Sequence, residues 1–224
     1  NTACLVALFN KTITMQPTIF DLRFGSDNKS LAHWLAQTNG PALVEILSNK
    51  SDDFVRSVFA QENKEGESLF ETLLKHKGTL LKDILDGKSE AFVTQILSTI
   101  DDSEESVAHS LAHGNGKLLK EILKGRSDEM LSFVMELRID SNESVAHWLA
   151  QYDGHELAKI LSERSDEFVM SILELKIKNK YSVAHWLAQH NSAILKEILK
   201  GKSETFVWSV LDMSYPNGES VASW

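Results

Sequence analysis

Apolar and polar positions along the chain repeat with a constant period of 38 residues. A serine opens each period, without insertion or deletion between neighbours, at Ser30, Ser68, Ser106, Ser144, Ser182 and Ser220. Two clear copies read SVAHWLAQYDGHELAKILSERSDEFVMSILELKIKNKY and SVAHWLAQHNSAILKEILKGKSETFVWSVLDMSYPNGE, from the fourth and fifth of these serines. Because repeats of this length are typical of stacked helical units, the pattern predicts a helical solenoid.

Each unit contains three short helical patterns. The first begins at the repeated serine, whose hydroxyl can cap a helix N-terminus. We expect a left-handed glycine to end this helix at Gly40, Gly78, Gly116 and Gly154, with Ser192 as the exception. The second pattern repeats the spacing of Leu43, Ile46 and Leu47 in all five units, which makes one apolar helical stripe.

The third helix of each unit also begins at a capping serine. These serines are followed by Asp or Glu, which suits the positive end of a helix dipole, and they are Ser51, Ser89, Ser127, Ser165 and Ser203. The side chains expected to face inward are Phe54, Phe92, Met130, Phe168 and Phe206. Helices this short are marginal alone, so each unit must bury its stripe against its neighbours.

The predicted fold is therefore an all-α α-solenoid of five 38-residue repeats, each with about three short helices. The repeats span residues 30–67, 68–105, 106–143, 144–181 and 182–219. Residues 1–29, with Pro17 in a first helical turn, are expected to form an N-terminal cap. Residues 220–224 start a sixth, truncated repeat, and we expect the chain to be a piece of a longer one.

Composition and charge narrow the range of partners and compartments that we expect for the protein. Apolar residues make up 42% of the chain, and no apolar run approaches the ~20 residues that span a bilayer, so we expect a soluble protein without a membrane partner. The formal charge of -9 disfavours nucleic acid as a partner. The single cysteine, Cys4, cannot form an internal disulfide, which fits a cytoplasmic protein; delivery into another cell as part of a larger protein stays open.

The motif SVAHWLAQ, followed by a glycine and then ELAKIL, resembles the first two helices of an ankyrin repeat. Ser-Val-Ala-His stands where that family has Thr-Pro-Leu-His, and the match is closest over residues 144–161. The unit departs from the family in its length, in one extra residue before the glycine, and in a third helix where ankyrin repeats carry a β-hairpin finger. The resemblance implies a scaffold that binds other proteins.

A three-helix unit also resembles, more weakly, the Pumilio-type RNA-binding repeats. On that alignment, the residues facing RNA would be Glu143, Ser144 and His147, or Tyr181, Ser182 and His185. The serine and histidine hardly vary between units, so they cannot read a varied base sequence, and Glu67, Glu105 and Glu143 would face phosphates. A fainter similarity to DNA-reading bacterial effector repeats rests on the residue pairs before the glycine.

A histidine column invites a metal or catalytic interpretation. It comprises His33, His109, His147 and His185, with Glu71 and Ser223 in its other two places. Neighbouring units lie ~10 Å apart, whereas zinc ligands lie about 2 Å from the ion, so these histidines cannot share one metal. We expect each histidine to bond its capping serine or the adjacent loop. The sequence shows no nucleophile, paired carboxylates or phosphate loop, and we predict no enzyme, cofactor, metal or small-molecule substrate.

Two neighbouring columns on the first helix are candidates for partner binding. The tryptophans of one column are Trp34, Trp148 and Trp186, and the variable column beside it includes Thr38, His76, Tyr152 and His190. Partly exposed aromatic side chains in a row would give the rigid contact area that binding hot spots use. Packing between adjacent first helices explains the tryptophans equally well.

A basic column precedes the third helix in every unit. Its members are Lys50, Lys88, Arg126, Arg164 and Lys202. They suit the negative end of the second helix and nearby carboxylates, and as a ladder they could instead follow a phosphate backbone. We therefore predict protein or peptide binding along one solenoid face, with nucleic-acid binding as the alternative and a passive spacer or dimerisation arm as a third possibility.

Overall fold

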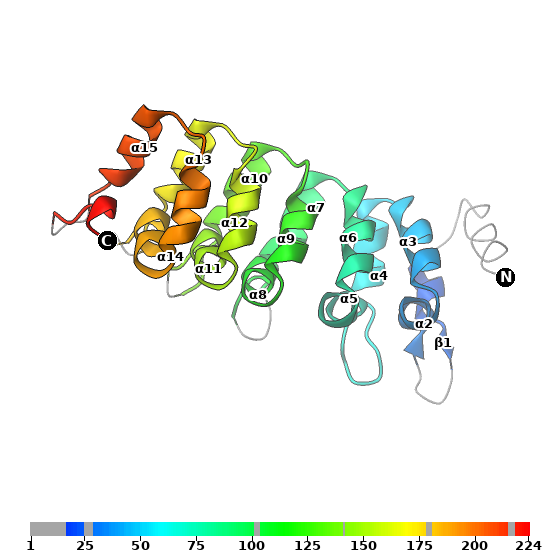
Figure 1. The fold of residues 1–224 in the computed structure, drawn as a ribbon. Helices are drawn as coiled ribbons and strands as arrows, with labels where there is room; N and C mark the ends of the chain where they lie inside the picture. Colours follow the sequence, from blue (N-terminus) through cyan, green and yellow to red (C-terminus); the bar gives the residue numbers. More distant parts are fainter. Residues whose placement is uncertain (1–16, 25–28, 101–103, 141, 178–180, 215–217) are drawn as a thin grey trace. The chain divides into compact units, whose positions relative to one another are not determined.

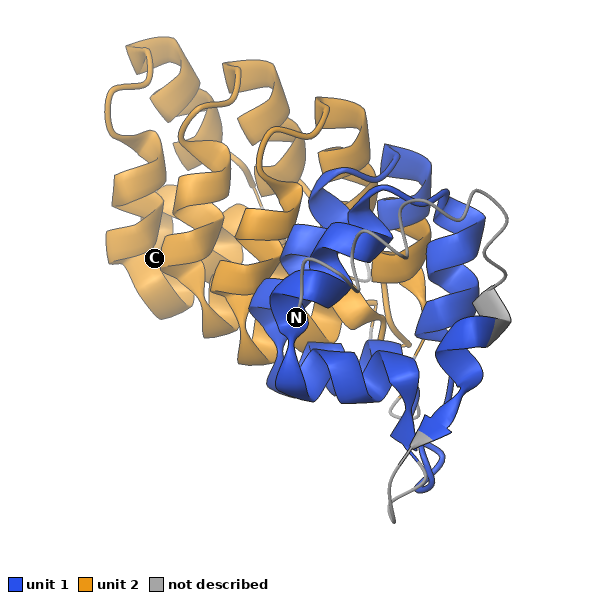
Figure 2. Ribbon diagram, turned by 90° about the vertical axis from the view of Figure 1, so that its right-hand side faces the viewer, with its two compact units in different colours: residues 1–93 blue, residues 94–224 orange. Residues whose placement is uncertain are grey.

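The computed structural model describes residues 17–24, 29–100, 104–140, 142–177, 181–214 and 218–224 (Figure 1). They are mostly helical, with two short strands among them, which confirms the predicted all-α repeat fold. Contacts divide the chain into two compact units, residues 1–93 and 94–224 (Figure 2). Cys4 lies outside the described residues.

Unit 1 contains the N-terminal segment, the first repeat and most of the second repeat. Its helices are η1 (Pro17–Asp21), α2 (Leu31–Thr38), α3 (Gly40–Ser48), α4 (Asp52–Phe59), α5 (Leu69–His76) and α6 (Gly78–Asp86). Antiparallel strands β1 (Arg23–Phe24) and β2 (Lys29–Ser30) pair Arg23 with Ser30. The 3-10 helix η1 packs on α2 and α4, where the buried ring of Phe20 meets the edge of Phe54.

Unit 2 contains the later repeats. Its helices are α8 (Val107–Gly114), α9 (Gly116–Leu123), α10 (Asp128–Glu136), α11 (Val145–Tyr152), α12 (Gly154–Leu161), α13 (Asp166–Leu173), α14 (Val183–Leu199), α15 (Glu204–Leu211) and η2 (Val221–Ser223). Helix α7 (Glu90–Ser98) begins in unit 1 and ends in unit 2. Helix α14 joins the first and second helices of its repeat across a kink at Asn191.

Equivalent helices of successive repeats lie side by side within unit 2 (Figure 1). The first helices α8, α11 and α14 form one row, and the second helices α9 and α12 continue into the second half of α14. The third helices α10, α13 and α15 form a further row. Leu119, Leu157 and Leu195, from the predicted apolar stripe, are buried between these rows.

Serine caps place the helix starts as the sequence predicts. At the start of α2, Ser30 Oγ accepts a hydrogen bond from His33 N, and at the start of α4, Ser51 Oγ accepts one from Phe54 N. The same cap recurs on α10, α13 and α15, where the serines are Ser127, Ser165 and Ser203. Each of these side chains satisfies a backbone donor that the helix leaves unpaired.

The prediction for the repeated glycines is wrong. Gly40, Gly78, Gly116 and Gly154 are the first residues of second helices, and none has a positive φ. The following repeat comes close at two of these positions: a Cβ would lie 2.5 Å from Leu80 Cδ1 at Gly40 and 2.9 Å from Asp153 Cβ at Gly116. The residue before each glycine breaks the helix, as at Asn39, with φ -153° and ψ 59°.

A short β-hairpin follows the third helix of each repeat. The third helix is therefore present in addition to a hairpin and does not take the hairpin's place. Isolated antiparallel bridges join Glu62 to Ser68, Ile100 to Ser106, Arg138 to Ser144, Lys176 to Ser182 and Ser214 to Ser220. A left-handed residue recurs in four of these turns, at Gly66, Glu104, Asn142 and Gly218. Each 38-residue repeat therefore combines three helices with a short β-hairpin, which leads into the next capping serine.

Candidate protein-binding face

The repeated Ser-x-x-His pair is a buried structural device. Ser30 Oγ lies 2.6 Å from His33 Nδ1, and the matching distance is 2.7 Å for Ser106 and His109. The pairs Ser144–His147 and Ser182–His185 have the same geometry, at 2.8 and 2.7 Å. All four histidines are buried. The prediction that the histidine bonds its capping serine is confirmed.

The hydrogen bonds define the tautomer of these rings. His109 Nε2 lies 3.4 Å from Glu143 O, and a carbonyl oxygen can only accept, so Nε2 carries the proton. Ser144 N donates to His147 Nδ1, which makes Nδ1 an acceptor there. His147 is therefore a neutral imidazole. Burial lowers the pKa of all four histidines, for His147 to about 4.

This arrangement removes the RNA-facing role that the weaker resemblance implied. Ser144, His147, Ser182 and His185 are buried and bonded in pairs, so they offer no edge to a ligand. His109 links its helix to the end of its own repeat, directly before the next capping serine.

An aromatic face lies across the first helices of unit 2. It consists of His113 on α8, Trp148 and Tyr152 on α11, and Trp186 and His190 on α14. The ring centroids of His113 and Tyr152 are 4.4 Å apart, and those of Trp186 and His190 are 5.0 Å apart. His113, Tyr152 and His190 are exposed, with Tyr152 at 47%. The aromatic face therefore combines packed rings with accessible ones.

Of the two interpretations of the tryptophan column, packing between first helices holds for Trp148, because only 8% of it is accessible. Its ring meets His109 and His113 edge-on at 5.3 and 5.8 Å, so it packs between adjacent first helices. Trp148 Nε1 donates to Glu143 Oε2 at 3.1 Å. Trp148 thus supports Tyr152, whose ring lies 5.7 Å away, and does not itself serve as an exposed anchor.

Trp186 takes the equivalent place on α14 and is half-buried. Its ring meets that of His147 edge-on at 6.2 Å. Tyr181 stands where Glu143 stands for Trp148, so the carboxylate acceptor is missing, and the buried Trp186 Nε1 makes no hydrogen bond with the described residues. Trp186 therefore lacks the hydrogen bond that Trp148 makes with Glu143.

The candidate residues of unit 1 are exposed but do not form such a cluster. Trp34 is 41% accessible on α2, where Thr38 Oγ1 donates to Trp34 O. His76 is exposed on α5. Thr72, which takes the tryptophan position on α5, is buried and donates to Glu67 Oε2. Among the predicted residues, Tyr152 contacts Trp148 and Trp186 contacts His190, whereas no ring contact among the described residues joins Trp34 to His76.

Three members of the basic column, Lys88, Arg164 and Lys202, bond groups of the preceding repeat. Lys88 is 5% exposed, and its Nζ donates to Leu47 O, Ser48 O and Lys50 O at 2.9, 3.0 and 2.6 Å. Arg164 bonds Arg126 O and pairs with Asp128 at 2.5 Å. Lys202 does the same one repeat later, with Arg164 O and Asp166. Lys88 thus caps the end of α3, as the helix dipole favours. Arg164 and Lys202 instead bond the loop after the second helix of the preceding repeat and the first residue of its third helix.

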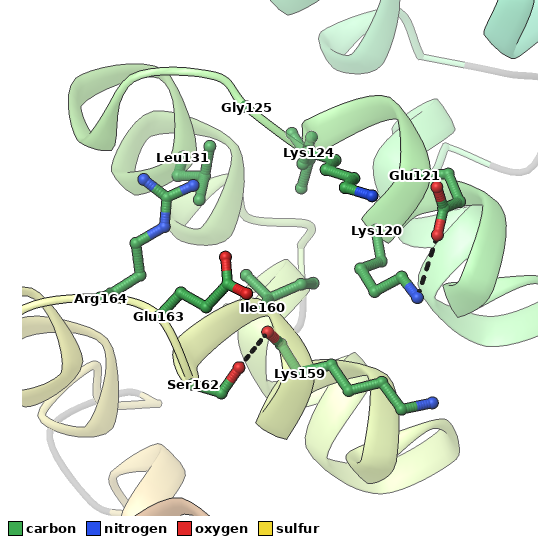
Figure 3. Close-up of a pocket in the computed structure, with 11 residues that line it drawn as sticks. Lys120, Glu121, Lys124, Gly125, Leu131, Lys159, Ile160, Ser162, Glu163 and Arg164 are labelled. Carbon is green, nitrogen blue, oxygen red and sulfur yellow. Dashed lines mark hydrogen bonds and ion pairs between the residues drawn. The ribbon is translucent and has the colours of Figure 1, made fainter.

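A cavity of about 290 Å³ opens between α9 and α12 (Figure 3). Lys120 on its wall pairs with Glu121 and Glu156, both at 3.0 Å, and Lys159 pairs with Glu156 at 2.5 Å. Glu156 is buried; desolvation acts to raise its pKa, but bonds from the two lysines lower it overall. The cations and carboxylates largely neutralise each other, so the cavity does not favour a charged ligand.

Sequence reasoning missed His113, Glu143 and Glu156 as contributors to these surfaces. His113 stands one residue before the variable column and faces Tyr152 of the next repeat, which only the stacking reveals. Glu143 stands directly before a capping serine, and the sequence places it only in the RNA-facing set of the weaker resemblance, where it would oppose phosphates. Its contact with a tryptophan five residues later was readable as proximity on the first turn.

No model of a known protein family matches the chain, and no curated protein matches it either. Within the described residues, no helix is long and apolar enough to cross a membrane. The same part of the chain contains no group of three or more His, Cys, Asp or Glu side chains placed to hold a metal ion.

Proposed function

We propose that this chain is a non-enzymatic scaffold that binds a protein or peptide partner on the aromatic face of unit 2. One observation carries the proposal. Tyr152 is exposed, yet its ring is held between His113 and Trp148, and Glu143 fixes the indole of Trp148. A rigid aromatic side chain loses little entropy on binding, which is why such residues dominate hot spots.

The position of the aromatic face on the repeat array also supports a binding role. First helices from three repeats contribute to it, so an extended partner could contact several of them at once. We also propose an ankyrin-like character for the array. The short hairpin that joins each third helix to the next first helix supports this, because ankyrin-type repeats present a finger at that place. The lone cysteine supports a cytoplasmic site of action.

The test compares proteins retained from a cell lysate by variants of the chain. The variant His113→Ala/Tyr152→Ala removes the accessible rings of the aromatic face. Phe133→Ala, on α10, is the matched control, because Phe133 is an exposed aromatic of the same unit on a third helix. We expect wild type and control to retain the same partner and the double variant to retain at least about tenfold less, a loss of ~1.4 kcal/mol.

Equal retention by all three proteins would remove the aromatic face as the binding site. Nuclease treatment of the lysate and a rise in salt identify the alternative. Retention through phosphate contacts falls by ~0.9 log units per log unit of salt for each phosphate neutralised. A partner lost after nuclease treatment would replace the protein-binding proposal with nucleic-acid binding. The internal use of Lys88, Arg164 and Lys202 weighs against that outcome.

A further inference from the structure

The last repeat of unit 2 ends in an apolar groove. The groove has a volume of about 730 Å³ and lies between the second half of α14 and α15. Leu199, Val207 and Leu211 line it and remain only half-buried. We call this surface, with the start of α15 beside it, the end surface.

The preceding repeats show what normally covers this surface. Leu161, Val169 and Leu173 are the equivalents one repeat earlier, and all three are buried, at 1% exposure or less. They lie on α12 and α13, against which α14 and α15 pack. Leu123, Leu131 and Met135, one repeat further back on α9 and α10, are buried in the same way beside α12 and α13. The end surface is therefore one half of the interface between repeats.

The polar groups of the end surface also match that interface. At each internal junction of unit 2, the cation of the later repeat bonds a backbone carbonyl and a carboxylate of the earlier one. Lys202 reaches Arg164 O at 3.1 Å and Asp166 Oδ1 at 2.9 Å. Lys202 O and the exposed Glu204 occupy those two acceptor positions on the end surface. Their natural complement is a lysine or arginine.

The chain also approaches the end surface in the required direction. Ser214 bridges to Ser220, as Lys176 does to Ser182 one repeat earlier. Ser220 then begins η2, in which Val221 is buried against α14 and α15. The first turn of a first helix is therefore already in place.

We propose that the end surface is a docking site for one further helical unit of the same 38-residue type, entering through η2. Such a unit covers Leu199, Val207 and Leu211 with its apolar stripes. Its cation, placed before its third helix, bonds Lys202 O and Glu204. The continuity of this surface with the established interface between repeats is the basis for choosing this occupant.

The test extends the chain after Trp224 with a copy of residues 187–219, which completes a sixth unit in register. Hydrogen exchange and urea denaturation compare it with the parent chain. We expect amides of α15 to exchange at least about tenfold more slowly in the extended chain, because the new interface must open first. The denaturant slope should also rise, since more surface becomes buried.

Two matched variants make the result specific. In one, the copied Leu195, Ile198 and Leu199 become serine, and no protection of α15 is expected. In the other, Glu204→Lys opposes the new cation, and the protection should fall while the parent chain with the same substitution stays folded. Equal exchange in the extended chain and the serine variant would overturn the proposal. So would a concentration-dependent dimer of the parent chain that vanishes on extension, because a second copy would then be the occupant.

Discussion

Replacing Lys88 with methionine is expected to lower the free energy of unfolding by about 2–4 kcal/mol. The ammonium group is buried and bonds three backbone carbonyls, of Leu47, Ser48 and Lys50. Methionine keeps the aliphatic stem but leaves these acceptors without their charged donor. Relief of the buried charge offsets part of the loss, so the expected change is smaller than the sum of three charge-assisted hydrogen bonds.

Lys50→Met is the matched control for this substitution. Lys50 holds the same column position in the first repeat, where its Nζ lies 5.8 Å from the Phe54 ring centre instead of bonding a cluster of carbonyls. We expect this variant to lose about 1 kcal/mol or less, as for an exposed cation–π contact. Urea denaturation followed by circular dichroism measures both. Equal losses for the two variants would mean that the column does not join repeats in unit 1.

Acidification is expected to destabilise the protein before its carboxylates titrate. The folded pKa of His147 is lowered from 6.5 to about 4, first by burial. The unfolded chain therefore binds a proton that the folded chain does not, between these two pH values. Stability from this group is complete above pH 6.5 and is lost as pH falls toward 4, by about 3 kcal/mol.

The other three buried histidines, His33, His109 and His185, act in the same direction because burial lowers their pKa values as well. Urea denaturation at several pH values between about 7.5 and 4.5 measures the summed effect. His147→Gln serves as the comparison, since it removes one of the titrating groups, and its stability should vary less with pH. An unfolding free energy that stays constant over this range would contradict neutral buried imidazoles.

Much of the fold was predictable because the same pattern of capping and apolar residues occurs in all five repeats. Capping serines and the stripe of Leu43, Ile46 and Leu47 each recur in phase, so a local signal that is weak in one copy becomes decisive. The prediction that the repeated glycines are left-handed was wrong because a second structural requirement also selects glycine. A left-handed turn and a close approach both demand glycine, and only the position of Leu80 or Asp153 separates them.

The candidate face was less predictable, because exposure depends on the neighbouring repeat. Trp148 and Trp34 occupy the same sequence column, yet Trp148 packs on His109 and His113 whereas Trp34 stays exposed. The basic column shows the same limit. Its spacing suggested either helix capping or a ladder along a phosphate backbone, and the short distances from Lys88 Nζ to carbonyl oxygens establish capping at that rung.

Hydrogen exchange of the chain with and without its retained partner tests the central claim most directly. If the partner binds the aromatic face, amides of α8, α11 and the first half of α14 should gain protection, centred on His113, Tyr152 and His190. The third helices α10 and α13 should exchange as they do in the free protein. Protection confined to those third helices, with the first helices unchanged, would contradict the account.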